Sequence, residues 1–220
     1  NEPSRSELDS HADTCVLGCN ALITHDYERP CEVTGYHASE KPRTCRTVSG
    51  VIGYSDPATG RPFYLVVNQA IHVPENPHNL LCPFQMRVND VKVNDLPKHL
   101  SIAPTDETHA VQIPLDNDGN VLTIPLSLDG VTSYFPTFKP SLEEYESAEE
   151  GENLFHLTYA EPDWDPHSPN YANSEESMLE ASGRVSTKDW AASRRLSSVY
   201  FVNQPDPEQI SAITSVADRG

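Results

Sequence analysis

The 220-residue sequence contains no long hydrophobic run. A membrane-spanning helix needs roughly 18 consecutive apolar residues, and no stretch of the chain approaches that length. The chain also has no secretory signal, and it begins at Asn1 rather than at Met. We therefore expect no membrane partner, and we expect the chain to be a piece of a longer protein.

Basic residues are scarce: the chain has 15 Lys and Arg against 33 Asp and Glu, which gives a net charge of −18. Such a charge argues against direct binding to nucleic acid or to an anionic membrane. Twelve of the acidic residues lie between positions 141 and 181, where Lys and Arg are absent. The rest of the chain therefore accounts for only six of the 18 net negative charges.

The five cysteines form no metal-binding pattern, since they are odd in number and no Cys-x-x-Cys occurs: Cys15, Cys19, Cys31, Cys45 and Cys82. We expect reduced thiols in an intracellular protein, with one or two disulfides as the alternative. The hydrophobic fraction of 37%, the 19 prolines and a mean hydropathy of −0.52 favour a small domain with polar tails.

Strand signals dominate the first 140 residues. Two β-rich runs, 44–54 and 63–73, flank turn residues and predict a long hairpin. A second hairpin is predicted from 111–115 and 121–126, around an Asp-Gly pair. Residues 91–93 predict an edge strand, and apolar residues at near-helical spacing predict a short helix over 80–87.

The most informative stretch reads Leu8-Asp9-Ser10-His11-Ala12-Asp13-Thr14-Cys15-Val16-Leu17. It combines an acidic turn with an aliphatic run that predicts a strand. With glycine in place of His11 it would be the active-site loop of retroviral and retrotransposon aspartic proteases, which it closely resembles. The alternative is an Asx-type turn that opens an ordinary strand.

A second stretch strengthens this resemblance. After the long hairpin, Ile71–Pro74 precedes Asn79-Leu80-Leu81. In copia-type retrotransposon proteins an apolar-Tyr-Val-Pro strand similarly leads to Asn-Leu-Leu-Ser and a short helix. In retroviral proteases the matching turn carries an Arg that pairs with the acidic residue four after the catalytic Asp, and the equivalents here are His78 and Asp13.

The resemblance covers about residues 7–96 and implies an all-β fold, a retropepsin-like closed barrel with one short C-terminal helix. Since only Leu8 is apolar just ahead of Asp9, the strand before the loop is expected to be shortened or cut away. The implied organisation is a protease domain at 1–100, a β-hairpin extension at 101–140, an acidic, largely disordered linker at 141–185 and a short helical segment at 186–220.

The implied activity is that of an aspartic endopeptidase that cleaves its own retrotransposon polyprotein between apolar residues, in the cytoplasm within the element's virus-like particle. This hydrolysis needs two carboxylates about 3 Å apart that share one proton. Only one Asp-Ser-x-Ala loop occurs, so the enzyme would be a homodimer with Asp9 from each subunit. No cofactor and no metal are implied.

The residues that the resemblance assigns fall into two groups. The catalytic loop comprises Asp9, Ser10 and His11, where Ser10 would brace the loop and His11 stands at the glycine position. Substrate would be held by the loop and by a flap in the long hairpin, through Ala12, Asp13, Gly50, Val51, Ile52 and Gly53. A plain structural hairpin is the alternative to a flap.

Other functions remain open at this point. His11 and His78 favour a catalytically degenerate relic that serves as a structural or assembly module of the polyprotein. Alternation along one segment would also place Asp9, His11 and Asp13 on one face, where they would bind a metal ion with His25, His37 or His72. The acidic tail with its aromatic residues is a further candidate for binding a partner.

Overall fold

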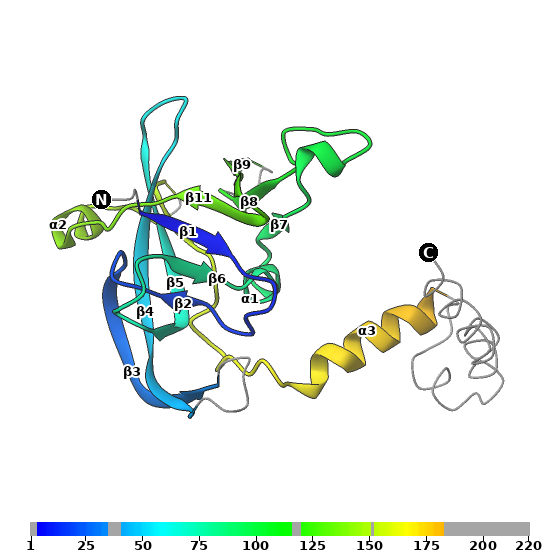
Figure 1. Cartoon of the computed structure of the whole chain (residues 1–220), viewed down its shortest axis with the longest axis horizontal. Coiled ribbons are helices and arrows are strands. Elements are labelled where there is room, and N and C mark those ends of the chain that lie inside the picture. The colour runs from blue at the N-terminus through cyan, green and yellow to red at the C-terminus, as the bar shows by residue number, and fades with distance from the viewer. Residues whose placement is uncertain (1–3, 35–40, 116–119, 151, 183–220) are drawn as a thin grey trace, which may run out of the picture. The chain divides into compact units, whose positions relative to one another are not determined.

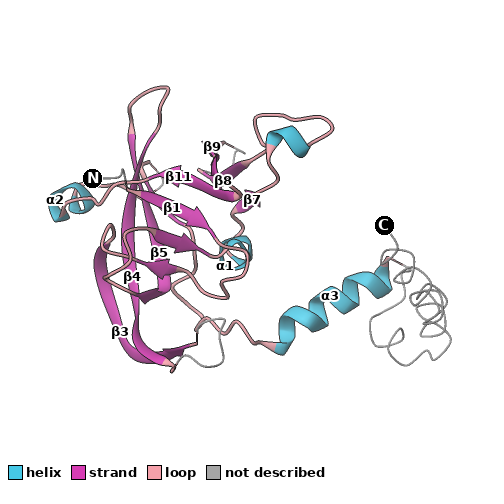
Figure 2. Ribbon diagram, viewed as in Figure 1, coloured by secondary structure: helices cyan, strands magenta, loops and turns pink. Residues whose placement is uncertain are grey.

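The computed structural model describes residues 4–34, 41–115, 120–150 and 152–182. It divides the chain into two compact units, Asn1–Pro166 and His167–Gly220. Strands dominate the first unit, which confirms the all-β prediction (Figure 2). The second unit contributes one described helix, α3 (Pro169–Ala181). The helical segment predicted at 186–220 lies outside the described residues.

The long hairpin is confirmed, and it lies near one end of the larger sheet, with one further strand beyond it. Its strands, β4 (Arg43–Ser55) and β5 (Pro62–His72), pair antiparallel over nearly their whole length. β3 (Leu22–Val33) pairs with the other edge of β4. Branched and aromatic side chains fill both faces of β4 and β5, so most of their residues are buried.

Five shorter strands extend the larger sheet beyond β5: β2 (Val16–Leu17), β6 (Asn79–Leu81), β1 (Arg5–Leu8), β11 (Thr132–Pro136) and β10 (Ser127–Asp129). The order is β10-β11-β1-β6-β2-β5-β4-β3, and it is open at both ends within the described residues. A closed barrel was predicted, and none is formed there. A bridge between Gly53 and Phe138 links β4 to the chain after β11 without extending into a ladder.

β1 corrects the expectation that the strand before Asp9 is missing. It forms from polar residues whose burial alternates, with Ser6 and Leu8 turned inward. The Ser6 hydroxyl lies 3.1 Å from that of Thr137 and accepts a hydrogen bond from the Asn79 side chain at 3.2 Å. Because these bonds satisfy the buried hydroxyl, the strand needs no apolar residue at this position.

A smaller sheet packs beside the larger one. It consists of β7 (Lys92–Asn94), β8 (Ala110–Pro114) and β9 (Val121–Pro125), in that order. The second predicted hairpin and the predicted edge strand are thereby confirmed. Helix α1 (Pro83–Val88) connects the larger sheet to the smaller one, and a 3-10 turn, Lys98–Leu100, lies between β7 and β8. α1 confirms the predicted short helix from Pro83 onward, whereas Leu80 and Leu81, which the prediction included, belong to strand β6 (Asn79–Leu81).

The prediction of a disordered linker from residue 141 is wrong for the first part of that segment. Helix α2 (Leu142–Glu146) begins with a capping box between Ser141 and Glu144, and β12 (Leu154–His156) pairs parallel with β5. The compact unit runs to Pro166, so the boundaries expected at residues 100 and 140 do not divide it. The acidic side chains point outward, whereas Phe155 and Leu157 are buried.

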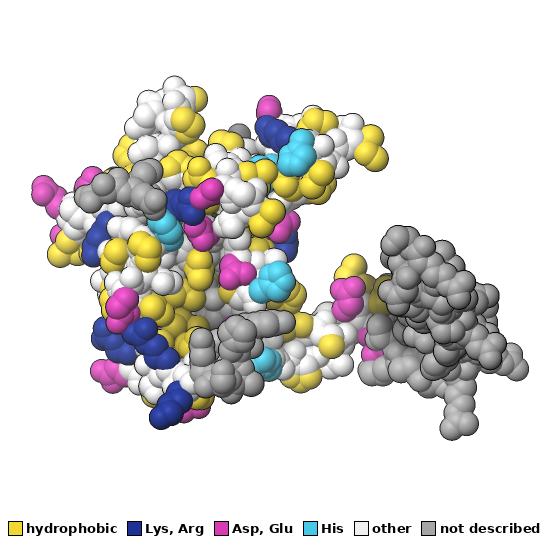
Figure 3. All heavy atoms as spheres, in the orientation of Figure 1, with side chains coloured by type: hydrophobic (Ala, Val, Ile, Leu, Met, Phe, Trp, Pro, Cys, Tyr) yellow, Lys and Arg dark blue, Asp and Glu magenta, His cyan; other side chains and the backbone are white. Residues whose placement is uncertain are grey.

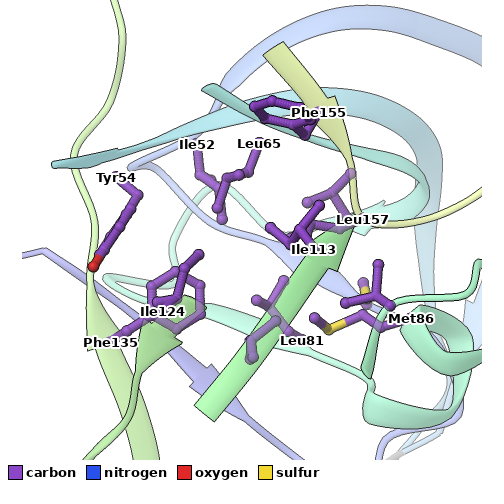
Figure 4. Close-up of a cluster of buried hydrophobic side chains, with 14 of the residues drawn as sticks. Ile52, Tyr54, Leu65, Leu81, Met86, Ile113, Ile124, Phe135, Phe155 and Leu157 are labelled. Atoms are coloured by element: carbon purple, nitrogen blue, oxygen red, sulfur yellow. The ribbon is translucent and has the colours of Figure 1, made fainter. Parts of the chain in front are cut away.

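One hydrophobic cluster receives side chains from both sheets, from α1 and from the segment at β12. Figure 4 shows Phe155 and Leu157 turned toward residues of the hairpin and of the smaller sheet, including Ile52, Leu65 and Ile113. The segment after residue 150 therefore helps to build the core.

The surface and the helices add two observations. On the face shown in Figure 3, acidic, basic and hydrophobic side chains are interspersed over the described part of the molecule rather than gathered by kind. Among the described helices, none is both long and apolar enough to cross a membrane.

Candidate active site

Asp9 lies directly after β1, in the loop that leads to β2. β6 lies between these two strands, parallel to β1 and antiparallel to β2. Leu8 is paired with Leu81, and the Asp9 N–H donates to the Leu81 carbonyl oxygen at 3.0 Å. The two stretches that carry the resemblance, far apart in the sequence, therefore lie side by side.

The Asp9 carboxylate is held by the loop that it opens. Its Oδ1 accepts a hydrogen bond from the His11 N–H at 2.9 Å, and its carbonyl oxygen accepts one from the Ala12 N–H at 3.3 Å. The side chain keeps 39% of its surface exposed. The carboxylate is thus oriented by the backbone and remains accessible from outside the chain.

His11 occupies the glycine position without backbone strain, since it is not among the residues with positive φ. Its N–H reaches the Asp9 carboxylate despite the side chain. The imidazole is 97% exposed, and its Nδ1 lies 4.0 Å from Asp9 Oδ1. The ring therefore stands beside the carboxylate, on the outside of the monomer.

The other loop residues differ from what was expected of them. The Ser10 side chain is exposed and makes no hydrogen bond to any described residue, so it does not brace the loop. Ala12 is half-buried, and the Asp13 side chain is exposed. The Asp13 carbonyl oxygen instead accepts a hydrogen bond from the indole Nε1 of Trp164 at 3.1 Å.

Buried polar groups secure the far end of the loop at Cys15. Its N–H donates to Gln85 Oε1 at 2.9 Å, and its Sγ accepts from the Cys82 N–H at 3.2 Å. Burial raises the pKa of the Cys15 thiol far above its usual range, and burial also raises that of Cys82. Both thiols therefore stay protonated and serve as packing groups rather than as nucleophiles.

Gly18 marks the tightest backbone approach near the site. Its N–H donates to the Asn79 side chain at 2.9 Å. A Cβ at this position would lie 2.8 Å from the His78 carbonyl oxygen and closer still to that of Asn76. Only glycine allows β2 and the chain before β6 to come this close.

The four residues expected in a flap lie in the interior instead. Gly50, Val51, Ile52 and Gly53 belong to β4, and all four are buried. A Cβ on Gly50 would meet the Leu17 side chain at 2.7 Å, whereas Gly53 is covered by the Phe138 ring. These residues are closed off by their own chain, so they do not offer a surface to a substrate.

The tip of the β4–β5 hairpin also lies away from Asp9. Gly53 and Phe138 exchange two backbone hydrogen bonds, and the neighbouring Thr137 N–H donates to the Ser4 carbonyl oxygen, just before β1. Asp9 follows the opposite end of β1. In Figure 1 the cyan tip projects at the top of the molecule, away from the blue connection between β1 and β2. This hairpin is therefore structural and is not a flap over Asp9.

The metal hypothesis gains no support from the described side chains, because no group of three His, Cys, Asp or Glu is placed there to hold an ion. His37, one of its candidate ligands, lies outside the described residues. The protein-family models, the curated proteins and the solved structures with which the chain was compared gave no match.

Three residues that support the Asp9 loop, directly or through the chain that leads to Trp164, were not predicted from the sequence: Gln69, Gln85 and Trp164. Gln69 has φ +52° at a register shift between β4 and β5 and is buried, which a β-rich run does not reveal. Trp164 is the only tryptophan of the acidic segment 141–181, and this is the one sequence signal that it is anchored.

Proposed function

We propose that the chain is a retropepsin-like aspartic endopeptidase domain of a copia-type retrotransposon polyprotein, and that it acts as a homodimer. One observation carries the proposal: the Asp9 loop and Asn79-Leu80-Leu81 are joined by a strand pairing and by the bond from Asp9 N–H to Leu81. The resemblance rests on these two stretches, so their pairing in the folded chain supports the proposal.

In the proposed mechanism the two Asp9 carboxylates of a twofold dimer face each other and share one proton. The ionised carboxylate takes a proton from a water molecule, which attacks the peptide carbonyl carbon, while the protonated one donates to the carbonyl oxygen. The tetrahedral intermediate then collapses: the C–N bond breaks, the leaving nitrogen receives the proton taken from water, and the second carboxylate regains its proton from the hydroxyl group. The pair titrates as a unit. The exposed fraction of Asp9 and its orientation by the His11 N–H support this role.

The imidazole of His11 favours a second candidate function. It is almost wholly exposed and lies 4.0 Å from Asp9 Oδ1, beside the carboxylate that a second copy would have to approach. If the ring fills that space in the dimer, the two carboxylates stay apart and the domain serves as an assembly module of the polyprotein. The ancestry would be the same, and the activity would be lost.

Turnover of a precursor peptide at pH 4 to 6 tests the proposal. We expect wild-type protein to cleave and Asp9→Asn to be inactive, because an amide provides no base for the water. Asp106→Asn is the matched control, since it removes one exposed carboxylate outside the loop. Equal turnover in wild-type and Asp9→Asn protein would remove the catalytic function.

A further inference from the structure

The segment that follows β12, residues 157–166, continues along β5 toward the Asp9 loop, and we call it the strap. At its start the Leu157 N–H donates to the Val66 carbonyl oxygen at 2.8 Å. Thr158 and Asn68 then exchange three hydrogen bonds: Asn68 N–H to Thr158 Oγ1, Thr158 Oγ1 to the Asn68 carbonyl oxygen, and Asn68 Nδ2 to the Thr158 carbonyl oxygen. The strap is thus fixed to β5 up to the bulge.

Gln69 anchors the middle of the strap. Its Nε2 lies 2.8 to 3.2 Å from three strap carbonyl oxygens, those of Tyr159, Ala160 and Pro162. Its Oε1 accepts from the Trp164 N–H at 2.7 Å. The left-handed backbone at Gln69 aims this buried side chain at the strap, which is the usual effect of a β-bulge.

A second group reinforces the anchor from β3. Arg29 donates to Gln69 Oε1 at 2.9 Å and forms an ion pair with Asp163 at 2.6 Å. β3, β5 and the strap are therefore joined at the side-chain amide of Gln69. The backbone of Trp164, one residue beyond Asp163, is held by its hydrogen bond to Gln69 Oε1.

The strap ends on the Asp9 loop. The Trp164 indole Nε1–H is shared between the Asp13 carbonyl oxygen and Thr14 Oγ1, each at 3.1 Å. The Trp164 ring lies against Phe84 of α1, with 6.4 Å between ring centroids. The loop is therefore held at its start by Leu81 and near its end by an indole from about 150 residues downstream.

We propose that Trp164 is a positioning residue for the Asp9 loop, and that the strap belongs to the functional site. This inference rests on the proposed function for its catalytic consequence. It accounts for the exposed, unbonded hydroxyl of Ser10, because the indole supplies the support that Ser10 does not. A carboxylate that must meet its mate within about 0.5 Å of the productive geometry needs a loop with both ends fixed.

Hydrogen exchange followed by NMR tests the positioning directly. The reporters are the His11 and Ala12 amides, which donate to Asp9 within the loop. Trp164→Phe keeps the ring and removes the N–H donor, so we expect exchange at both amides to become about fivefold to tenfold faster. Phe84→Leu is the matched control, since it removes the ring contact and keeps both indole bonds, and it should leave these amides unchanged.

Thr14→Val keeps the test valid if Trp164→Phe proves unstable, because it removes one acceptor and leaves the indole in place. Exchange in the Trp164→Phe, Thr14→Val double variant should be no faster than in Trp164→Phe alone, since both changes break the same contact. Loop exchange unchanged in Trp164→Phe, or raised equally by Phe84→Leu, or additive in the double variant, would overturn the positioning role.

Peptide turnover separates this inference from the proposed function. In an active enzyme we expect Trp164→Phe to lower kcat about fivefold with KM altered less than about twofold, as for a group that aligns reacting atoms. If exchange rises and kcat stays the same, Trp164 does not position the carboxylate. If wild-type protein is inactive, the proposed function fails, whereas exchange still decides whether the indole holds the loop.

Discussion

Phe155→Ala tests whether the acidic segment after residue 150 is part of the folded unit. Phe155 is 5% exposed, it is paired in register with Leu65 of β5, and its ring lies 6.2 Å from that of Phe63. Removing a buried phenyl group costs about 3–5 kcal/mol, from lost transfer free energy and from the cavity left behind. Domains of this size are stable by about 5–15 kcal/mol, so the loss would be a large share of the total.

Urea unfolding followed by circular dichroism measures this loss. Leu142→Ala is the matched control, because Leu142 lies in the same acidic segment and is 57% exposed, so its effect should stay within about 0.5 kcal/mol. If Phe155→Ala changed the free energy of unfolding by less than about 1 kcal/mol, β12 would not be packed on β5. The strap would then lose its structural basis as well.

Three further changes have defined outcomes. His11→Gly removes the ring beside the Asp9 carboxylate and should raise peptide turnover on the order of tenfold, and an unchanged rate would show that the ring does not obstruct the dimer. Gly18→Ala should lower the free energy of unfolding by about 1–3 kcal/mol in a urea titration, because its Cβ would press on two backbone carbonyl oxygens; a neutral effect would contradict the close approach. Burial lowers the pKa of His109 below its ordinary 6.5, so the unfolded chain binds the proton first as the pH falls, and stability is complete above about pH 6.5 and declines below it. His109→Gln should reduce the difference in unfolding free energy between pH 7 and pH 5, and an unaltered difference would assign the pH dependence to other groups.

The sequence alone predicts those elements in which the order of apolar and turn residues shows which side chains are buried. The β4–β5 hairpin and the β8–β9 hairpin are apolar runs around turn residues, and α1 begins where Cys82 caps the helix and Pro83 opens it. Local chemistry of this kind needs no knowledge of the partners. The resemblance gave only the order of the Asp9 loop and Asn79-Leu80-Leu81 along the chain, and the pairing of Leu8 with Leu81 became visible only in the structure.

The remaining features depend on partners that are distant in the sequence. β1 is polar and folds because Ser6 finds Thr137 and Asn79 inside the core. The residues after 150 were expected to be disordered because acidic side chains lower the mean hydropathy of the segment. Phe155 and Leu157 are nevertheless buried where this segment pairs with β5.

The flap prediction failed for a related reason. Glycines in a β-rich hairpin suggest pliability, but here Gly50 and Gly53 allow a side chain from another element to cover the strand. The role of a glycine in a strand depends on what packs above it, and a single sequence does not contain that information.

The central claim is that two copies of Asp9 meet across a twofold axis, and a cysteine at that position measures it most directly. Asp9→Cys would be made with Cys19 and Cys31 replaced by Ser, since these are the thiols that are not buried. Two cysteines that face each other across the axis should form a disulfide on mild oxidation and give a non-reducing band at about twice the 24.4 kDa of the chain. Asp106→Cys in the same background should stay monomeric. A monomeric Asp9→Cys protein, or equal cross-linking at both positions, would contradict the account.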